Sequence, residues 1–286
     1  MILQETDTLP NGVAIPKLAL GTWMIDDSDV AEAVKAAIEI GYRHIDTAQA
    51  YGNERGVGEG VRNSGIPRDQ LFVQTKLEAG IKDYEEAKAG IDASLETLGL
   101  DYVDLLIIHS PQPWDHFGSD DRFFEGNLAT WKAMEEALEA GKVRAIGVSN
   151  FQRQDLANLI ENASVKPMID QVLAHVGNTP FDLIDYAKSN DMLVEAYSPI
   201  GHGKILENDE IAKIARKYDV SVPQLCIRYI LQLGLLALPK TANPDHMKSN
   251  ADVDFEISPA DMDALKAIDA KDYGDASNFP VYSGKS

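Results

Sequence analysis

Short β-branched runs alternate eight times with longer amphipathic stretches along this chain of 286 residues. Such an alternation is typical of parallel sheets whose strands are joined by helices. Strands are predicted at residues 17–21, 43–46, 71–76, 103–109, 143–150, 167–171, 192–197 and 235–240. Helices are predicted at residues 28–40, 83–98, 127–140, 153–162, 181–189, 221–232 and 259–268. No linker interrupts the even spread of apolar residues, so residues 1–286 are predicted to form a single domain.

Two folds share this alternation, the open doubly wound sheet and the closed (β/α)8 barrel. Every predicted strand ends at or beside a polar or aromatic residue that is able to do chemistry. These residues are Thr22, Trp23, Asp46, Lys76, His109, Ser149, Asn150, Gln171, Tyr197 and Lys240. In an open sheet the outer strand ends lie far from the single crevice, whereas in a barrel all eight ends surround one site. The chain is therefore predicted to be an α/β protein with a (β/α)8 TIM barrel.

Three further segments complete the predicted barrel. An Asn11-Gly12 pair between apolar residues predicts a two-residue β-hairpin before the first strand, where it would plug the bottom of the barrel. Residues 110–126 and 271–286 are too long and too aromatic for plain connectors. They are predicted to be long loops at the C-terminal face that form walls over the site.

The composition argues against several classes of partner. A formal net charge of -20 repels nucleic acid and anionic membranes at long range. No stretch approaches the roughly 18 apolar residues of a membrane span, and the N-terminus is acidic rather than basic. Cys226 is the only cysteine, so no internal disulfide is possible, and its apolar neighbours predict a buried packing role. A cytoplasmic protein without nucleic-acid or membrane partners is expected.

Other familiar motifs are incomplete in this sequence. The glycines Gly56, Gly58 and Gly60 lack the further glycine of a dinucleotide fingerprint, and they are interpreted as the small-residue face of a helix that packs on the barrel. The six histidines have neither an i, i+4 partner nor cysteines at ligand spacing, so no metal site is predicted. No serine lies in a Gly-x-Ser-x-Gly elbow, which argues against the common hydrolases.

Four residues, Asp46, Tyr51, Lys76 and His109, combine into the parts needed to protonate a carbonyl oxygen. A free phenol has a pKa near 10, and a neighbouring Lys76 ammonium is expected to lower it and so activate Tyr51 as a proton donor. Asp46 would supply the counter-charge that keeps a lysine charged inside a barrel. His109 would donate a hydrogen bond that orients the substrate oxygen.

The chain resembles the aldo-keto reductases, and most closely their bacterial 2,5-diketo-D-gluconic acid reductase-like branch. The motifs that carry the resemblance are Leu20-Gly-Thr-Trp23, Gly41-Tyr-Arg-His-Ile-Asp-Thr-Ala-Gln-Ala-Tyr-Gly-Asn-Glu54, Leu105-Leu-Ile-Ile-His109, Gly147-Val-Ser-Asn-Phe151, Ala196-Tyr-Ser-Pro199 and Pro239-Lys-Thr241. The resemblance implies that Asp46, Tyr51, Lys76 and His109 form the catalytic tetrad, with Tyr51 as general acid. It also implies that Tyr197 stacks on a nicotinamide ring whose carboxamide is held by Ser149, Asn150 and Gln171. The full set of cofactor-binding residues that it implies is Gly21, Thr22, Ser149, Asn150, Gln171, Tyr197, Ser198, Lys240, Thr241, His246 and Asn250.

Two positions depart from the family pattern. His246 stands where the family has an arginine that clamps the cofactor's 2'-phosphate, so NADPH is expected to be preferred only weakly and NADH use is expected as well. Ser110 stands where many relatives have tryptophan, which is expected to open or polarise the pocket for small polar carbonyls such as diketo-acids, glyoxals or sugar-derived aldehydes. The residues expected to bind substrate are Trp23, Tyr51, His109, Ser110 and Trp114.

The predicted activity is therefore NAD(P)H-dependent reduction of an aldehyde or ketone by a monomer. One alternative is a non-catalytic NAD(P)H-binding regulatory protein on the same scaffold, because the regulatory potassium-channel β subunits resemble this family. A second alternative is a Schiff-base aldolase, because a lysine at the end of a barrel strand also performs that chemistry. Asp46 beside Lys76 argues against it, since a lysine held in its charged form is a poor nucleophile.

Overall fold

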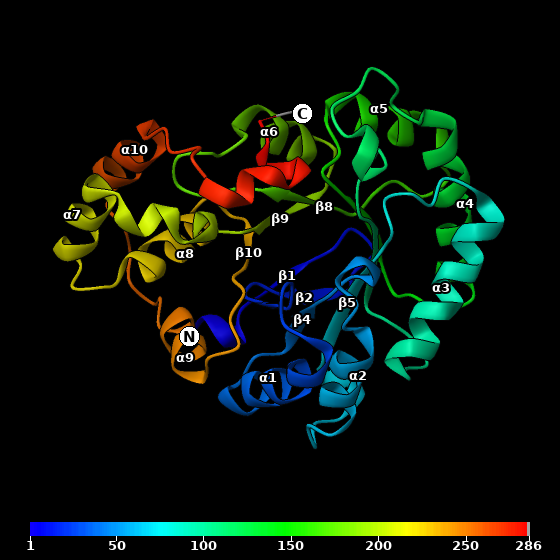
Figure 1. Cartoon of the computed structure of the whole chain (residues 1–286), viewed down its shortest axis with the longest axis horizontal. Coiled ribbons are helices and arrows are strands. Elements are labelled where there is room, and N and C mark those ends of the chain that lie inside the picture. The colour runs from blue at the N-terminus through cyan, green and yellow to red at the C-terminus, as the bar shows by residue number, and fades with distance from the viewer. Residues whose placement is uncertain (285–286) are drawn as a thin grey trace.

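Eight parallel strands form one sheet whose spatial order follows the chain from β3 to β10 (Figure 1). The computed structural model describes residues 1–284. The strands are β3 (Leu20–Gly21), β4 (His44–Asp46), β5 (Phe72–Leu77), β6 (Leu105–Ile108), β7 (Ile146–Ser149), β8 (Ile169–Leu173), β9 (Leu193–Tyr197) and β10 (Leu236–Leu238). Parallel bridges join Leu18 to Ala237 and Gly21 to Lys240, so the last strand meets the first and the sheet closes. The predicted (β/α)8 barrel is confirmed.

Helices surround the strands in Figure 1. They are α1 (Asp27–Ile40), α2 (Glu54–Arg62), α3 (Tyr84–Leu98), α4 (Phe124–Glu139), α5 (Arg153–Asn162), α6 (Phe181–Ser189), α7 (Asp209–Lys217), α8 (Val222–Gln232), α9 (Pro244–Ala251) and α10 (Pro259–Ala267). Local sequence sets several of their ends. The Asp83 carboxylate accepts the backbone N–H groups of Glu85 and Glu86 at the start of α3, and left-handed Gly99 ends that helix.

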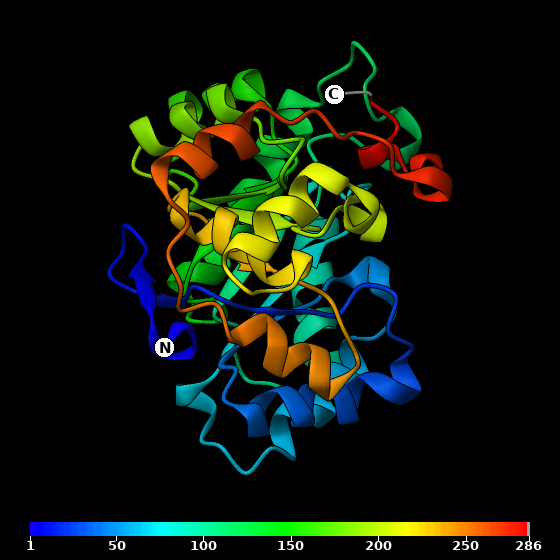
Figure 2. The ribbon, with the colours of Figure 1, turned by 90° about the vertical axis from the view of Figure 1, so that its left-hand side faces the viewer.

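A two-stranded antiparallel hairpin, β1 (Thr6–Thr8) and β2 (Ala14–Pro16), precedes the barrel. It lies on the opposite side of the molecule from the C-terminal segment (Figure 2). Its predicted two-residue turn is wrong, because five residues separate the paired Thr8 and Ala14. Pro10, which lacks an N–H group, stands directly before the Asn11-Gly12 pair, so the strands part earlier than the sequence pattern suggests.

The barrel interior and the helix-facing sides of the strands are both buried. Burial on both faces explains why the strands read as continuous apolar runs rather than as alternating ones. Cys226 on α8 is fully buried, which confirms its predicted packing role. Within residues 1–284, no helix is both long enough and apolar enough to cross a membrane.

The glycines of α2 pack against neighbouring helices and not against the barrel strands, which corrects the prediction for this face. A Cβ on Gly56 would lie 2.4 Å from the Asp27 carbonyl oxygen of α1. A Cβ on Gly58 would lie 1.9 Å from the Leu98 carbonyl oxygen at the end of α3. Glycine at these positions therefore sets how closely α2 approaches α1 and α3.

Replacing Gly58 with alanine is expected to lower the free energy of unfolding by about 3 kcal/mol, because an added methyl group here meets backbone that cannot rotate away. The control is Gly80→Ala, since a Cβ at Gly80 would meet nothing within 4 Å. Urea unfolding monitored by circular dichroism measures both variants. Equal stability of the two variants would show that α2 and α3 separate freely.

Candidate active site

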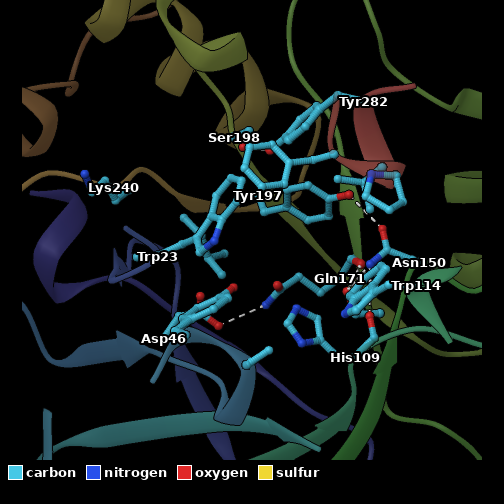
Figure 3. A pocket seen from close by; sticks show the side chains of 18 residues that line it. Trp23, Asp46, His109, Trp114, Asn150, Gln171, Tyr197, Ser198, Lys240 and Tyr282 are labelled. Carbon is cyan, nitrogen blue, oxygen red and sulfur yellow. Dashed lines mark hydrogen bonds between the residues drawn. The ribbon is translucent and has the colours of Figure 1, made fainter. Parts of the chain in front are cut away.

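A cavity of about 400 Å³ opens at the carboxyl ends of the strands (Figure 3). It is lined by Gly21, Trp23, Asp46, Ala50, Tyr51, His109, Trp114, Ser149, Asn150, Gln171, Tyr197, Ser198, Leu238, Lys240, Phe279, Pro280, Val281 and Tyr282. The strand ends therefore meet at one place, which is the property that separated the barrel from the open sheet. This volume suits a small molecule or part of a larger one.

Lys76 lies at the centre of a hydrogen-bonded group just below the cavity surface. It is fully buried on β5, and its Nζ donates to Asp46 Oδ1 of β4, to the Thr47 carbonyl oxygen at 2.9 Å and to the Tyr51 hydroxyl at 3.2 Å. A buried ammonium is tolerated only where acceptors replace its water and an opposite charge balances it. The three oxygens around Lys76 meet both conditions.

The Tyr51 hydroxyl faces the cavity from the short helical turn after β4. Burial, and then the negative charge of Asp46, raise the pKa of Tyr51 well above its usual value. The structure thus differs from the expectation that this pKa is lowered, because burial of the phenol, together with the negative charge of Asp46, disfavours the phenolate. The Tyr51 phenol is therefore protonated at neutral pH and can donate its proton to a bound molecule.

His109, directly after β6, borders the same cavity. Its ring packs edge to face on Tyr51, with 5.6 Å between centroids, and on Trp114, with 5.1 Å. Burial, and then the Lys76 charge, lower the pKa of His109 well below its usual value, so the imidazole is neutral. Its buried Nδ1 has no hydrogen-bond partner among the described residues. A neutral imidazole can still donate one N–H to a substrate oxygen.

Side chains at the ends of the three successive strands β7, β8 and β9 form another part of the cavity wall. The Ser149 hydroxyl donates to the Gln171 carbonyl oxygen at 2.8 Å, and Asn150 Nδ2 donates to the His109 carbonyl oxygen at 3.0 Å. The Tyr197 hydroxyl donates to Asn150 Oδ1 at 2.7 Å (Figure 3). The Asn150 amide is thus paired within the protein, and a ligand that needs its oxygen must share it with Tyr197.

Aromatic side chains from distant segments cover the cavity. Trp23 packs edge to face on Phe279 and His202, at centroid distances of 5.1 and 5.2 Å, and it stacks on Tyr282 at 6.2 Å. The Tyr282 and Ser198 hydroxyls are hydrogen-bonded at 2.6 Å, which anchors the tail. The long loops predicted at the C-terminal face are therefore present, with Trp114 supplied by one and Phe279 to Tyr282 by the other. Residues 285–286 of the predicted wall lie outside the described part of the chain.

Besides Lys76, which lies beneath the cavity surface, five residues expected at the site do not line this cavity: Thr22, Ser110, Thr241, His246 and Asn250. The Thr22 hydroxyl donates to the Asp46 carbonyl oxygen at 2.9 Å and is fully buried. Ser110 is also fully buried, and its carbonyl oxygen accepts from Lys82 Nζ at 2.9 Å. The Ser110 hydroxyl accepts the Gln112 N–H at 3.3 Å, and the expectation that a serine at this position opens or polarises the pocket stays a prediction.

Thr241 follows β10, whereas His246 and Asn250 belong to α9. Four residues apart, His246 and Asn250 lie on the same side of α9, where His246 is exposed and Asn250 is buried. Lys240, which does line the cavity, connects it to this segment.

Known proteins with the same architecture identify the family. The aldo/keto reductase family model matches residues 17–270. A glyoxal reductase from Bacillus subtilis is 41% identical over 268 residues, which is 93% of each chain. An aldo/keto reductase structure from Brucella melitensis superposes with a TM-score of 0.86 at 39% identity, covering 94% of this chain and 99% of that one. The chain belongs to the aldo/keto reductase family.

This aldo/keto reductase is an NAD(P)H-dependent carbonyl oxidoreductase. A Bombyx mori aldo-keto reductase, solved in complex with NADP, is 33% identical and superposes with a TM-score of 0.84 over 97% of this chain and 98% of that one. The residues present fit a nicotinamide dinucleotide, because an aromatic ring, two side-chain amides and a cation, Lys240, line one cavity. Among the described residues, no group of three or more histidine, cysteine or acidic side chains is placed to hold a metal ion.

Sequence reasoning missed several polar residues inside the barrel of this reductase. Gln74 and Glu195 are fully buried; Glu195 Oε2 accepts from both Gln74 and Gln171, and Gln74 also donates to Asp46. One signal was available for Glu195. It stands two residues before Tyr197 on β9, so alternation along the strand places both on the same face.

Proposed function

We propose that this enzyme reduces small aldehydes or ketones to alcohols, with Tyr51 as the general acid. The observation that supports the proposal is the contact of the Tyr51 hydroxyl with Lys76 Nζ, at 3.2 Å, on a cavity that His109 also borders. A bound reduced nicotinamide supplies hydride to the carbonyl carbon. The carbonyl oxygen takes the Tyr51 proton, and Lys76 stabilises the resulting phenolate. The neutral His109 orients the oxygen before transfer.

The cofactor is proposed to lie along the part of the cavity wall formed by the ends of β7, β8 and β9. Tyr197 would stack on the nicotinamide, and Ser149, Asn150 and Gln171 would face its carboxamide. Gly21 and Ser198 line the same cavity, whereas Thr22, whose hydroxyl and backbone N–H both donate to the Asp46 carbonyl oxygen, would act by fixing the backbone next to Gly21. Lys240 and Thr241 would hold phosphate, and His246 and Asn250 on α9 would meet the adenosine end. Trp23, Tyr51, His109 and Trp114 remain as the proposed substrate contacts.

NADPH is proposed as the preferred cofactor, with appreciable use of NADH. His246 is exposed and offers no permanent charge, and Lys248 is 3.6 Å from Asp245, which offsets its charge. His246→Arg is expected to raise the NADPH to NADH ratio of kcat/KM by about tenfold, because a guanidinium adds a charge-assisted pair with the 2'-phosphate. Steady-state kinetics with both cofactors measures the ratio. A strong NADPH preference that His246→Arg leaves unchanged would contradict the proposal.

The test of the activity is oxidation of NADPH, followed by absorbance, with methylglyoxal, a sugar-derived aldehyde and a nitrobenzaldehyde as substrates. Small polar carbonyls remain the proposed substrates, and the similarity to a glyoxal reductase supports glyoxals. Among the residues proposed to bind them, the aromatic side chains and His109 line the cavity, whereas Ser110 lies behind its surface. Tight NADPH binding without turnover of any carbonyl in the panel would favour the alternative of a non-catalytic regulatory protein.

We also predict that the enzyme is a cytoplasmic monomer in which residues 1–286 form a single domain. Its membership of the 2,5-diketo-D-gluconic acid reductase-like branch is a further prediction. Size-exclusion chromatography with light scattering tests the oligomeric state directly.

A further inference from the structure

A buried polar cluster lies inside the barrel next to the Gln171 amide. Gln171 Nε2 donates to Glu195 Oε2 at 2.8 Å and to Asp46 Oδ1 at 3.2 Å (Figure 3 shows the second bond). Gln74 Nε2 donates to the same two oxygens, at 3.0 and 2.7 Å. Asp46 is 4% exposed and the other three side chains are fully buried. Two amides from β5 and β8 therefore converge on two acids from β4 and β9.

This arrangement fixes the direction of the Gln171 amide. Its nitrogen faces two acceptor oxygens, and a flipped amide would place its carbonyl oxygen against both of them. Because Nε2 is held inside the barrel, Oε1 is the amide atom left for the cavity that Gln171 lines. An oxygen accepts hydrogen bonds and cannot donate them. The cavity wall at Gln171 therefore offers a bound ligand a hydrogen-bond acceptor and no donor.

Hydrogen bonds from the two amides, rather than a close ion pair, hold the Glu195 carboxyl group in the barrel core. The nearest cationic candidate, His44, lies 3.7 Å away through Nε2, and its Nδ1 donates to the Pro16 carbonyl oxygen at 3.0 Å. Glu195 Oε1 has no hydrogen-bond partner among the described residues. Burial raises the pKa of Glu195, which favours its neutral form. Its hydrogen bonds are the two that it accepts from Gln74 and Gln171.

We propose that Glu195 is a positioning residue that directs the Gln171 amide oxygen into the cavity and so makes the site select a ring substituent with N–H donors. This inference rests on the proposed function, because the substituent in question is the carboxamide of the nicotinamide. Asp46 alone would hold the Gln171 amide less firmly than Glu195 does. Its hydrogen bond to that amide is the longer of the two, and the same Asp46 oxygen also accepts from Lys76.

The test measures dissociation constants by fluorescence quenching for three ligands. They are NADP⁺, its 3-acetylpyridine analogue, in which a methyl ketone replaces the carboxamide and removes the N–H donors, and adenosine 2',5'-bisphosphate, which has no nicotinamide. The parent protein is expected to bind NADP⁺ about tenfold more tightly than the acetyl analogue, the value of one good hydrogen bond. Glu195→Leu is expected to reduce this ratio to about twofold and to leave the affinity for the adenosine fragment unchanged.

Two variants separate positioning from folding. Glu195→Gln keeps an acceptor for Gln171, and its new N–H₂ group would face the His44 Nε2 lone pair, so the parent ratio is expected to return. Asp170→Asn is the matched control, because Asp170 is fully buried beside Gln171 on β8 but faces the other side of the strand. If Glu195→Leu fails to fold, Glu195→Asp replaces it, since one methylene less withdraws the acceptor and is also expected to lower the ratio.

The outcomes distinguish the inference from the proposed function. A parent protein that binds neither dinucleotide would overturn both. A parent that prefers the carboxamide, with Glu195→Leu or Glu195→Asp showing the same preference, would overturn the role of Glu195 alone. A parent without any preference between the two dinucleotides would also overturn it.

Discussion

Replacing Tyr51 with phenylalanine is expected to lower kcat for carbonyl reduction by about a thousandfold, the typical contribution of a positioned general acid. The variant lacks the proton that the new alkoxide must receive, and no other described donor touches Lys76 from the cavity side. The dissociation constant of NADPH should change little, because Tyr51 faces the substrate end of the cavity. Steady-state kinetics combined with a cofactor titration measures the two effects separately.

The loss should not reflect unfolding. Among residues 1–284 the Tyr51 hydroxyl has one hydrogen-bond partner, Lys76, so its removal should cost about 1 kcal/mol of stability. Tyr84→Phe is the matched control, since it also removes one phenol oxygen, which bonds Glu136 at 2.6 Å on the outer helices. The control is expected to keep the parent kcat. A Tyr51→Phe enzyme that retains more than about a tenth of the parent kcat would exclude Tyr51 as the general acid.

The barrel was predictable because its decisive features are local in the sequence. A strand buried on both faces needs an apolar run, and a crossover helix needs an amphipathic one, so the alternation is visible without any knowledge of contacts. The polar residue at each strand end then indicates closure, because only a closed sheet brings His109 and Lys240 to one cavity. The same reasoning placed Lys76 among Asp46 and Tyr51, although their roles rest on the activity tests.

The features that escaped prediction depend on which way a side chain turns. Thr22 and Ser110 directly follow strand-end residues of the site, yet both turn into the protein and bond backbone groups there. Gln74, Gln171 and Glu195 meet only because strands from distant parts of the chain close into a barrel. The spacing of residues 74, 171 and 195 in the sequence does not predict that contact. The raised pKa of Tyr51 was not predicted for the same reason, because it depends on how deeply the phenol is buried and on how close Asp46 lies to it.

Replacing Lys76 with methionine is expected to lower the free energy of unfolding by about 3–5 kcal/mol and kcat by at least about a hundredfold. Methionine preserves the length of the apolar stem, so the change removes mainly the charge. Asp46 is then left buried without its counter-charge, and Tyr51 loses the group that stabilises its phenolate. Urea unfolding and steady-state kinetics give the two effects. The matched control is Lys142→Met, whose partner Asp92 is exposed, and which should cost less than about 1 kcal/mol.

The double variant Asp46→Asn with Lys76→Met separates the two consequences. It leaves no unpaired charge in the barrel, and an asparagine oxygen at position 46 can still accept the amide N–H groups of Gln74 and Gln171. Stability should therefore return to within about 1–2 kcal/mol of the parent, because removing both partners of a buried pair costs far less than removing one. Activity should stay as low as in the single variant, because the ammonium beside Tyr51 is still absent. A double variant as unstable as Lys76→Met would show that Asp46 does not need a counter-charge. Recovered activity would show that the ammonium is not what prepares Tyr51 for proton transfer.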